Sequence, residues 1–140
     1  MTFLVLIPLL AMFGVFGESQ AQAHGASADL ELRVDYPTRY RYKQIDRVRV
    51  EVQNVSGAQL DTVTVAFDSS YTSRFSTLMF IPAAKEPFSV ELTHLAPGST
   101  RLVWVELQAE RYGRHRGALR AWRHGGSDTV SVALSTIIFP

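Results

Sequence analysis

The sequence contains no cysteine in its 140 residues. It therefore forms no disulfide, thiolate metal site or cysteine nucleophile, and packing alone has to hold the core. An excess of charge of one sign is also missing, because 14 Lys and Arg stand against 13 Asp and Glu. Nucleic-acid-binding domains usually carry a clear basic excess. We therefore expect no nucleic acid among the partners.

Signatures of catalysis and of metal binding are missing as well. The chain has no Gly-x-Ser-x-Gly nucleophile elbow and no clustered Asp-x-Asp calcium loop. Its four histidines are dispersed, without a ligand spacing beside a carboxylate partner. We therefore predict that the protein is not an enzyme, and we expect no catalytic residue, metal or cofactor.

Near its start, the sequence carries an uncharged apolar run over residues 2–17. A membrane span needs about 20 such residues, whereas the apolar part of a secretory signal needs only about 7–15. Ala21 and Ala23 offer the small residues of a cleavage site, but no Lys or Arg precedes the run as a signal peptide requires. The candidate membrane segment or signal core contains Thr2, Leu4, Leu6, Leu9, Leu10, Phe13 and Phe16.

Both interpretations of this apolar run predict the same domain organisation. Residues 1–23 form a cleaved signal peptide or an uncleaved, helical membrane anchor, residues 24–28 a linker, and residues 29–140 one domain. Either reading predicts an exported protein, in the periplasm or on the extracytoplasmic face of the cytoplasmic membrane. The domain would be released in the first case and tethered in the second.

Beyond residue 28, apolar and polar residues alternate with a period of two. Val48, Val50 and Val52, for example, alternate with charged and polar residues. Such alternation predicts strands with one buried and one solvated face. The alternating segments are residues 30–34, 48–52, 63–67, 88–92, 103–107 and 130–134. With a less regular segment at 71–82, they predict an all-β, immunoglobulin-like antiparallel β-sandwich of about seven strands, preceded by an N-terminal apolar helix.

Two motifs carry a resemblance to a known family. Residues 95–105, LAPGSTRLVWV, join an apolar strand to an alternating strand through a Pro-Gly turn, and the strand at 48–54 ends in Asn54 with Gly57 behind it. These features resemble bacterial envelope immunoglobulin-like modules of the CARDB type, over most of residues 30–139. The resemblance implies a sandwich used in adhesion, spacing or assembly, and it supplies no catalytic residues.

A basic stretch at residues 110–124 is the main candidate site. If it is extended, alternate side chains share one face, and together with the indole of the 103–107 strand they would form an Arg/Trp face. Arginine matches carboxylates and phosphates, so this face is a candidate for binding an anion or a partner. The alternative is a solvated strand face, paired across a hairpin with Glu106. The candidate residues are Arg114, Arg116, Arg120, Trp122 and Trp104.

A second cluster interleaves tyrosine with basic residues over positions 36–43. Aromatic and basic side chains together can stack on bases, sugars or lipid headgroups. Alternatively, the stretch is a loop whose tyrosine rings close the end of the core. The cluster contains Tyr36, Arg39, Tyr40, Arg41 and Tyr42.

These observations predict a non-enzymatic, exported interaction module that docks on an envelope or inner-membrane protein. Membrane association would follow from the tether or from export. A binding module for anionic glycans or lipid headgroups, acting through the Arg/Trp face, is the alternative. A small hydrolase would instead need a concave site with converging polar groups of perturbed pKa.

Overall fold

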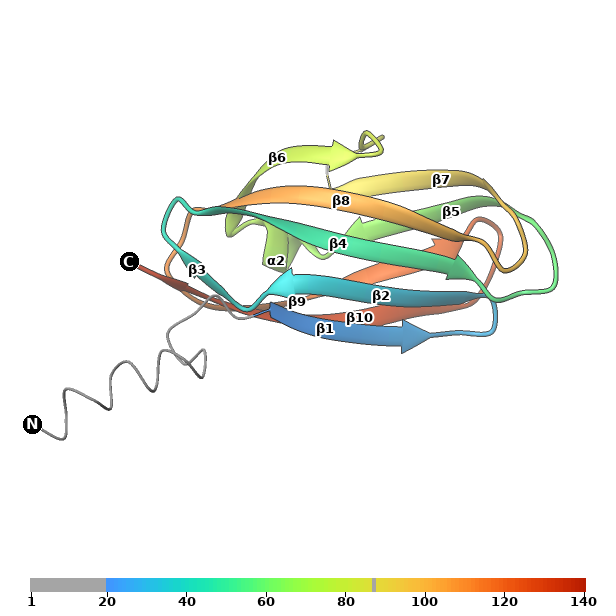
Figure 1. Cartoon of the computed structure of the whole chain (residues 1–140), viewed down its shortest axis with the longest axis horizontal. Helices are drawn as coiled ribbons and strands as arrows, with labels where there is room; N and C mark the ends of the chain where they lie inside the picture. The colour runs from blue at the N-terminus through green and yellow to red at the C-terminus, as the bar shows by residue number, and fades with distance from the viewer. Residues whose placement is uncertain (1–19, 87) are drawn as a thin grey trace, which may run out of the picture.

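The computed structural model describes residues 20–86 and 88–140, and within these ranges the chain forms a two-layered β-sandwich (Figure 1). Sheet I has the strand order β1-β2-β4-β8-β6, and sheet II the order β3-β10-β9-β5-β7. The strands of sheet I are β1 (Gln20–Ala26), β2 (Leu30–Pro37), β4 (Ile45–Asn54), β8 (Thr100–Ala109) and β6 (Phe75–Ile81). The strands of sheet II are β3 (Arg39–Arg41), β10 (Thr129–Phe139), β9 (Gly113–Arg123), β5 (Leu60–Phe67) and β7 (Ser89–Leu95).

The core lies between the sheets and is built by the period-two alternation. Val48, Val50 and Val52 of β4 are fully buried, and they belong to one continuous core with Leu119 and Ala121 of β9. All strand pairs are antiparallel except β3 with β10, which is parallel. The predicted all-β sandwich is therefore confirmed.

The described residues contain ten strands rather than about seven. The seven expected segments did not include β1, which carries alanine and glycine instead of large apolar residues, or β3, which has only three residues. They also did not include β9, which was expected only as a basic stretch that forms a face if it is extended. A four-residue helix, α2 (Ser69–Thr72), was not expected either. The predicted apolar helix, with its candidate membrane residues from Thr2 to Phe16, lies outside the described residues. Within the described ranges, no helix is long and apolar enough to cross a membrane.

Strand β1 changes the expected domain boundary. It pairs with β2 along its whole length, from Gln20 opposite Pro37 to Ala26 opposite Glu31. The expected linker at 24–28 is therefore replaced by the end of β1 and the start of its turn to β2. The physical reason is that β1 satisfies the backbone groups along the edge of β2.

The candidate cleavage residues lie inside β1. Ala21 and Ala23 are half-buried against the core. Gly25 brings β1 close to β10, because a Cβ at Gly25 would lie 3.0 Å from the side chain of Val132. Small residues therefore let β1 cover the gap between the two sheets, and cleavage after Ala23 would divide the strand.

The motif residues at one end of the sandwich tie two turns together. The Asn54 side chain donates hydrogen bonds to the carbonyls of Ala58 at 2.8 Å and of Leu95 at 2.9 Å. The backbone carbonyl of Asn54 accepts from the Gly98 amide at 2.8 Å, and Gly98 adopts a φ of +73°, which favours glycine. This end, called the far end, lies opposite the end at which β1 begins, β3 lies and β10 stops, called the β3 end (Figure 1).

Candidate functional site

The predicted basic face lies on β9, which runs through the middle of sheet II. Arg114, Arg116 and Arg120 are exposed, whereas Leu119 and Ala121, on the other side of the strand, are buried. Side chains at alternate positions of a strand point to the same side of the sheet. The three arginines therefore share the outer face of sheet II, as predicted.

The residues directly opposite these arginines on the neighbouring strands are uncharged. On β10, Arg116 lies opposite Ser135 and Arg120 opposite Ser131; on β5, Arg120 lies opposite Ala66. Trp122 is half-buried on the same face. Within the described ranges, no ion pair involves Arg114, Arg116 or Arg120. Their charges are therefore not neutralised by carboxylates of the sheet.

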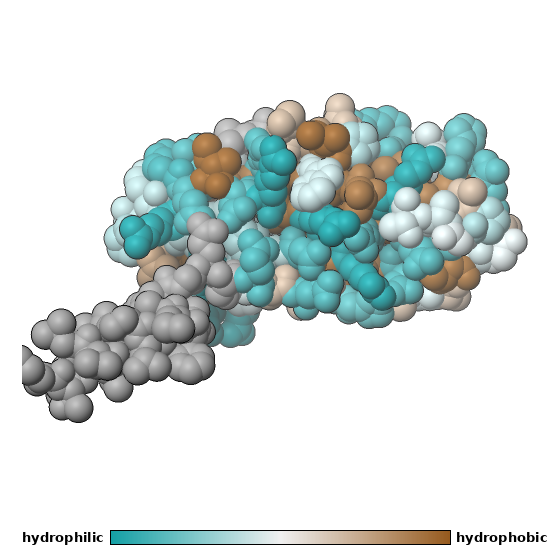
Figure 2. Space-filling model, in the orientation of Figure 1, coloured by the Kyte–Doolittle hydropathy of each residue, from teal (hydrophilic) through white to brown (hydrophobic). Residues whose placement is uncertain are grey.

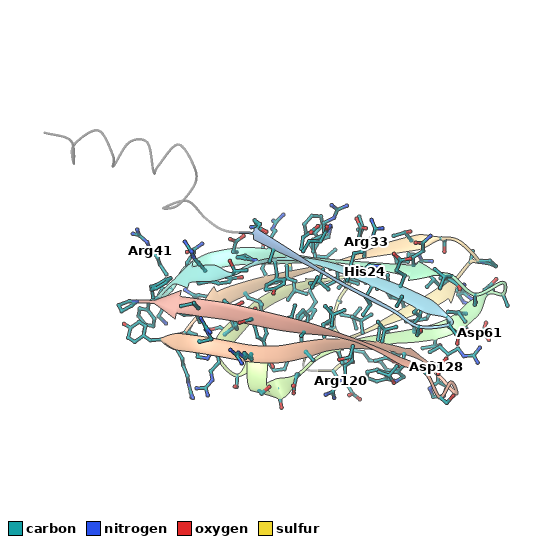
Figure 3. The ribbon with its side chains drawn as sticks, turned by 90° about the horizontal axis from the view of Figure 1, so that it is seen from below. His24, Arg33, Arg41, Asp61, Arg120 and Asp128 are labelled. Atoms are coloured by element: carbon teal, nitrogen blue, oxygen red, sulfur yellow. The ribbon has the colours of Figure 1, made fainter. Side chains whose placement is uncertain are left out.

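The outer face of sheet I has the opposite arrangement, because three of its arginines have glutamate partners. The nitrogen-to-oxygen distances are 3.5 Å for Arg33–Glu31, 2.8 Å for Arg47–Glu106 and 2.8 Å for Arg49–Glu51. In Figure 2, the view in which β2, β4 and β8 lie in front, this side is mostly hydrophilic with separate hydrophobic residues. Figure 3 labels Arg33 and Arg120 on opposite sides of the sandwich. The two faces thus differ in charge balance, although the whole chain is nearly neutral.

Trp104 does not belong to the basic face. It lies on β8 in sheet I, where the guanidinium carbon of Arg49 is 5.7 Å from the centroid of its ring. The expected hairpin between β8 and β9 is therefore wrong, and Glu106 binds Arg47 rather than Arg116. The physical reason is that residues 110–112 carry the chain from one sheet to the other instead of turning it back within a sheet.

The tyrosines of the second cluster divide between the core and the surface. Tyr36 and Tyr40 are buried, with 6% and 1% of their area exposed. The Tyr40 ring packs edge-on against Phe75, with centroids 5.2 Å apart, and burial raises the pKa of Tyr40 far above its usual range. These two rings therefore belong to the core, but they come from the strands β2 and β3 and not from the expected loop. Tyr42, by contrast, is 42% exposed.

The arginines of this cluster join the basic face. Strand β3 pairs with one side of β10 and β9 with the other, so that Ile137 has Arg39 and Arg114 as its two neighbours. The backbones of Arg39 and Arg114 are therefore about 10 Å apart, two strand spacings. The sequence alone did not predict that residues 36–43 and 110–124 lie together, because the parallel pairing of β3 with β10 links segments that are far apart in the chain. The arginine face consists of Arg39, Arg41, Arg114, Arg116 and Arg120.

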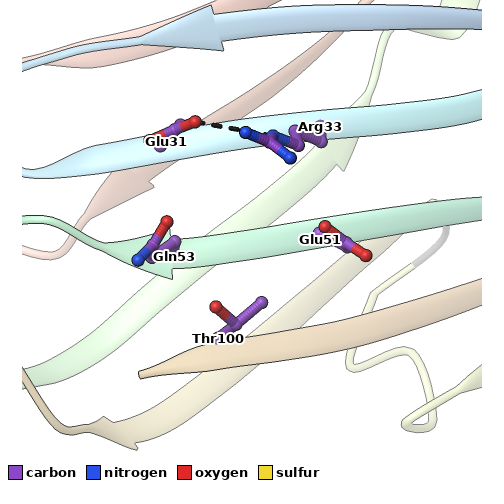
Figure 4. Close-up of a pocket in the computed structure, with 5 residues that line it drawn as sticks. All are labelled: Glu31, Arg33, Glu51, Gln53 and Thr100. Carbon is purple, nitrogen blue, oxygen red and sulfur yellow. Dashed lines mark ion pairs between the residues drawn. The ribbon is translucent and has the colours of Figure 1, made fainter. Parts of the chain in front are cut away.

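Two shallow hollows lie elsewhere on the surface. One, of about 160 Å³, is on the outer face of sheet I, where Arg33 is already paired with Glu31 (Figure 4). The hydrogen bond with His24 lowers the pKa of Glu31. The residues that line this hollow are Glu31, Arg33, Glu51, Gln53 and Thr100. The other, of about 200 Å³, lies at residues 59–62, Arg123 and His124. Within the described ranges, no three His, Asp or Glu side chains gather as metal ligands.

Comparison with known proteins shows the fold. No family model and no curated protein matches the chain. The CARDB domain of a Pyrococcus furiosus protein, solved in complex with di-metal ions, matches with a TM-score of 0.55 over 79% of this chain and 87% of that one, at 11% identity. The cupredoxin domain of amoB from Nitrosocaldus yellowstonii matches with a TM-score of 0.41 over 68% of this chain and 57% of that one, at 14% identity. The predicted CARDB-like, immunoglobulin-like fold is confirmed.

Proposed function

We propose that this chain is a non-enzymatic, exported interaction module whose arginine face docks on an acidic surface of an envelope or inner-membrane protein. The observation that carries the proposal is the contrast between the two sheets. Arg47 and Arg49 of sheet I are paired with glutamates, whereas Arg116 and Arg120 of sheet II have no ion pair within the described residues and lie opposite serine and alanine on the neighbouring strands. Guanidinium groups without carboxylate partners are suited to bidentate binding of carboxylates supplied by another molecule.

The shape of the face also supports a protein partner. Along β9, the six-residue separation of Arg114 and Arg120 spans about 20 Å, a length suited to a standard interface of about 800 Å² per partner. The small side chains of Ser131, Ala133 and Ser135 on β10 leave the guanidinium groups accessible from the side. Trp122 adds a half-buried indole, and arginine and tryptophan are enriched where protein interfaces gain their binding energy.

Export is supported by the sequence before the sandwich. Residues 2–17 are apolar and uncharged, as in a signal core or a membrane anchor. Both place a folded domain outside the cytoplasm, where an envelope or inner-membrane protein would be its partner. Strand β1 begins at Gln20, so the sandwich starts soon after this run.

A charge-matched pair of variants tests the docking face. Arg116→Gln with Arg120→Gln should abolish co-purification of the partner and leave thermal unfolding nearly unchanged, because both side chains are exposed. The control is Arg33→Gln with Arg47→Gln, which removes the same charge from sheet I. Equal loss of the partner in both variants, or none in the first, would contradict the proposal.

The salt dependence of binding and the identity of the bound molecule distinguish the alternative function from the proposed one. An anionic glycan or lipid headgroup could use the same guanidinium groups, since phosphate and sulfate share their geometry with carboxylate. Binding of the isolated protein to an anionic polysaccharide or to anionic vesicles, lost with Arg116→Gln and Arg120→Gln and weakened by salt, would favour that alternative. Co-purification of a protein that is lost with the same replacements and weakened by salt favours the proposed function.

A further inference from the structure

Three exposed aromatic side chains gather at the β3 end. Tyr42, Tyr112 and Phe139 are 42%, 57% and 46% exposed. The rings of Tyr42 and Tyr112 have their centroids 5.1 Å apart, and the Tyr42 amide donates to the Phe139 carbonyl at 2.7 Å. They come from the turn after β3, the connection before β9 and the end of β10. We call these three residues the aromatic tip.

The aromatic tip is held in place by polar contacts. Lys43 binds Glu110 at 2.7 Å, and its Nζ lies 5.3 Å from the centroid of the Tyr42 ring. Glu110 also accepts a hydrogen bond from Ser76, and the Lys43 amide donates to the Ala109 carbonyl at 2.8 Å. These contacts link the β3–β4 turn to the β8–β9 connection, so the rings are presented by a braced surface and need little ordering when they bind.

Cationic side chains surround the aromatic tip. Arg41 precedes Tyr42, while Arg111 and Arg114 flank Tyr112 and Gly113; all three arginines are exposed. Tyrosine is enriched at the level of lipid headgroups, where its ring contacts apolar groups and its hydroxyl stays hydrated. Arginine near an anionic membrane surface adds electrostatic attraction. The tip therefore has the composition of a surface that meets an anionic bilayer.

The apolar N-terminal run joins the sandwich at this same end. Gln20, the first residue of β1, pairs with Pro37, which lies just before β3 (Figure 1). Three peptide steps separate Gly17, the last residue of the run, from Gln20, and they span at most about 11 Å. A bilayer that holds residues 2–17 therefore lies beside the β3 end, whereas the far end points away from it.

We infer that the aromatic tip docks on the headgroup region of an anionic lipid bilayer. The tip rings enter the interface, and the surrounding arginines contact lipid phosphates. Docking at the β3 end orients the long axis of the sandwich away from the membrane and leaves the middle of the arginine face, at Arg116 and Arg120, accessible from the side. This inference assigns Arg41 and Arg114, at the end of the arginine face, to lipid and leaves Arg116 and Arg120 for the proposed protein partner. It goes beyond the docking on a protein and does not depend on it.

The absence of cysteine allows a direct test with single labels on the full chain. Pro140→Cys places a fluorescent label beside Phe139, and Gly57→Cys places one at the far end, where a new side chain meets nothing within 4 Å. The labelled chain is reconstituted into vesicles of phosphatidylcholine and phosphatidylglycerol with a brominated lipid as quencher. Quenching of the label at position 140 but not of that at position 57 is expected. Equal quenching at both positions, or none at either, overturns the inference.

Two variants distinguish contact of the aromatic tip with the bilayer from proximity that a membrane-bound N-terminal run would cause by itself. Tyr42→Ser with Tyr112→Ser should remove the quenching at position 140. Val55→Ser with Leu102→Ser is the control, because it removes two exposed apolar side chains away from the tip, each 42% exposed, and should leave the quenching intact. Thermal unfolding of both variants verifies the fold. Full quenching in the tyrosine variant overturns the inference, whatever the state of the arginine face.

Discussion

Tyr71 shows how single residues close the core at the β3 end. Its side chain is fully buried, and its hydroxyl lies 2.8 Å from the Thr136 hydroxyl, which donates to the Pro37 carbonyl at 3.2 Å. Burial raises the pKa of Tyr71 to about 12. The phenol therefore stays neutral at ordinary pH. It joins α2, β10 and the end of β2 in one hydrogen-bonded chain.

Gly117 of β9 makes room for Tyr71. A Cβ at position 117 would overlap the Cβ of Tyr71. Tyr71 cannot move away, because its ring is buried and its hydroxyl is hydrogen-bonded to Thr136. Gly117→Ala should therefore lower the free energy of unfolding by about 1–3 kcal/mol, the usual effect of overpacking. Urea denaturation measures the change. Gly57→Ala, where nothing lies within 4 Å, is the control, and equal stability of the two variants would refute this packing account.

At the scale of the element, β1 is part of the sandwich. Cleavage after Ala23 would remove residues 20–23, more than half of the strand, together with their pairing to β2. A chain that begins at His24 should be less stable than one that begins at Gln20 by about 2 kcal/mol or more, since a backbone hydrogen bond contributes roughly 1 kcal/mol. Urea unfolding of the two chains compares them. Identical midpoints would mean that β1 contributes nothing to the fold.

Local alternation predicted strands well where both faces of a strand are chemically distinct, as at Val48, Val50 and Val52. It missed β1, because the inward positions of this strand are Ala21, Ala23 and Gly25, which have methyl groups or no side chain and so carry little hydrophobic pattern. Alternation along one strand also says nothing about which sheet the strand joins. That is why Trp104 was expected beside β9 although β8 belongs to sheet I.

In the candidate site, too, a local pattern predicted one part, and the overall fold determined the rest. The shared face of Arg114, Arg116 and Arg120 follows from positions two and four residues apart on one extended strand, and was predicted. The addition of Arg39 and Arg41 depends on β3 pairing with β10 across about 100 residues of chain. Such non-local pairing is set by the whole fold, and a local pattern does not contain it.

At the scale of the molecule, a net charge of +1 conceals two different faces. In sheet I, Arg33, Arg47 and Arg49 are paired with glutamates, whereas in sheet II Arg116 and Arg120 lie opposite small uncharged residues. Association through sheet II should therefore be fast at low salt and weaken as ionic strength rises. The aromatic tip lies at one end of the same sheet, so membrane and partner would be bound on adjoining surfaces.

We propose that the partner binds to sheet II and not to sheet I. Site-specific photo-crosslinking in the native envelope tests it, with the crosslinking residue at Ser131, opposite Arg120 on β10, or at Gln53, on the outer face of β4. We predict a discrete protein adduct from position 131, lost when Arg116 and Arg120 are replaced by glutamine, and none from position 53. An adduct from position 53 alone, or an adduct from position 131 that survives those replacements, would show that the partner does not dock through the arginines of sheet II.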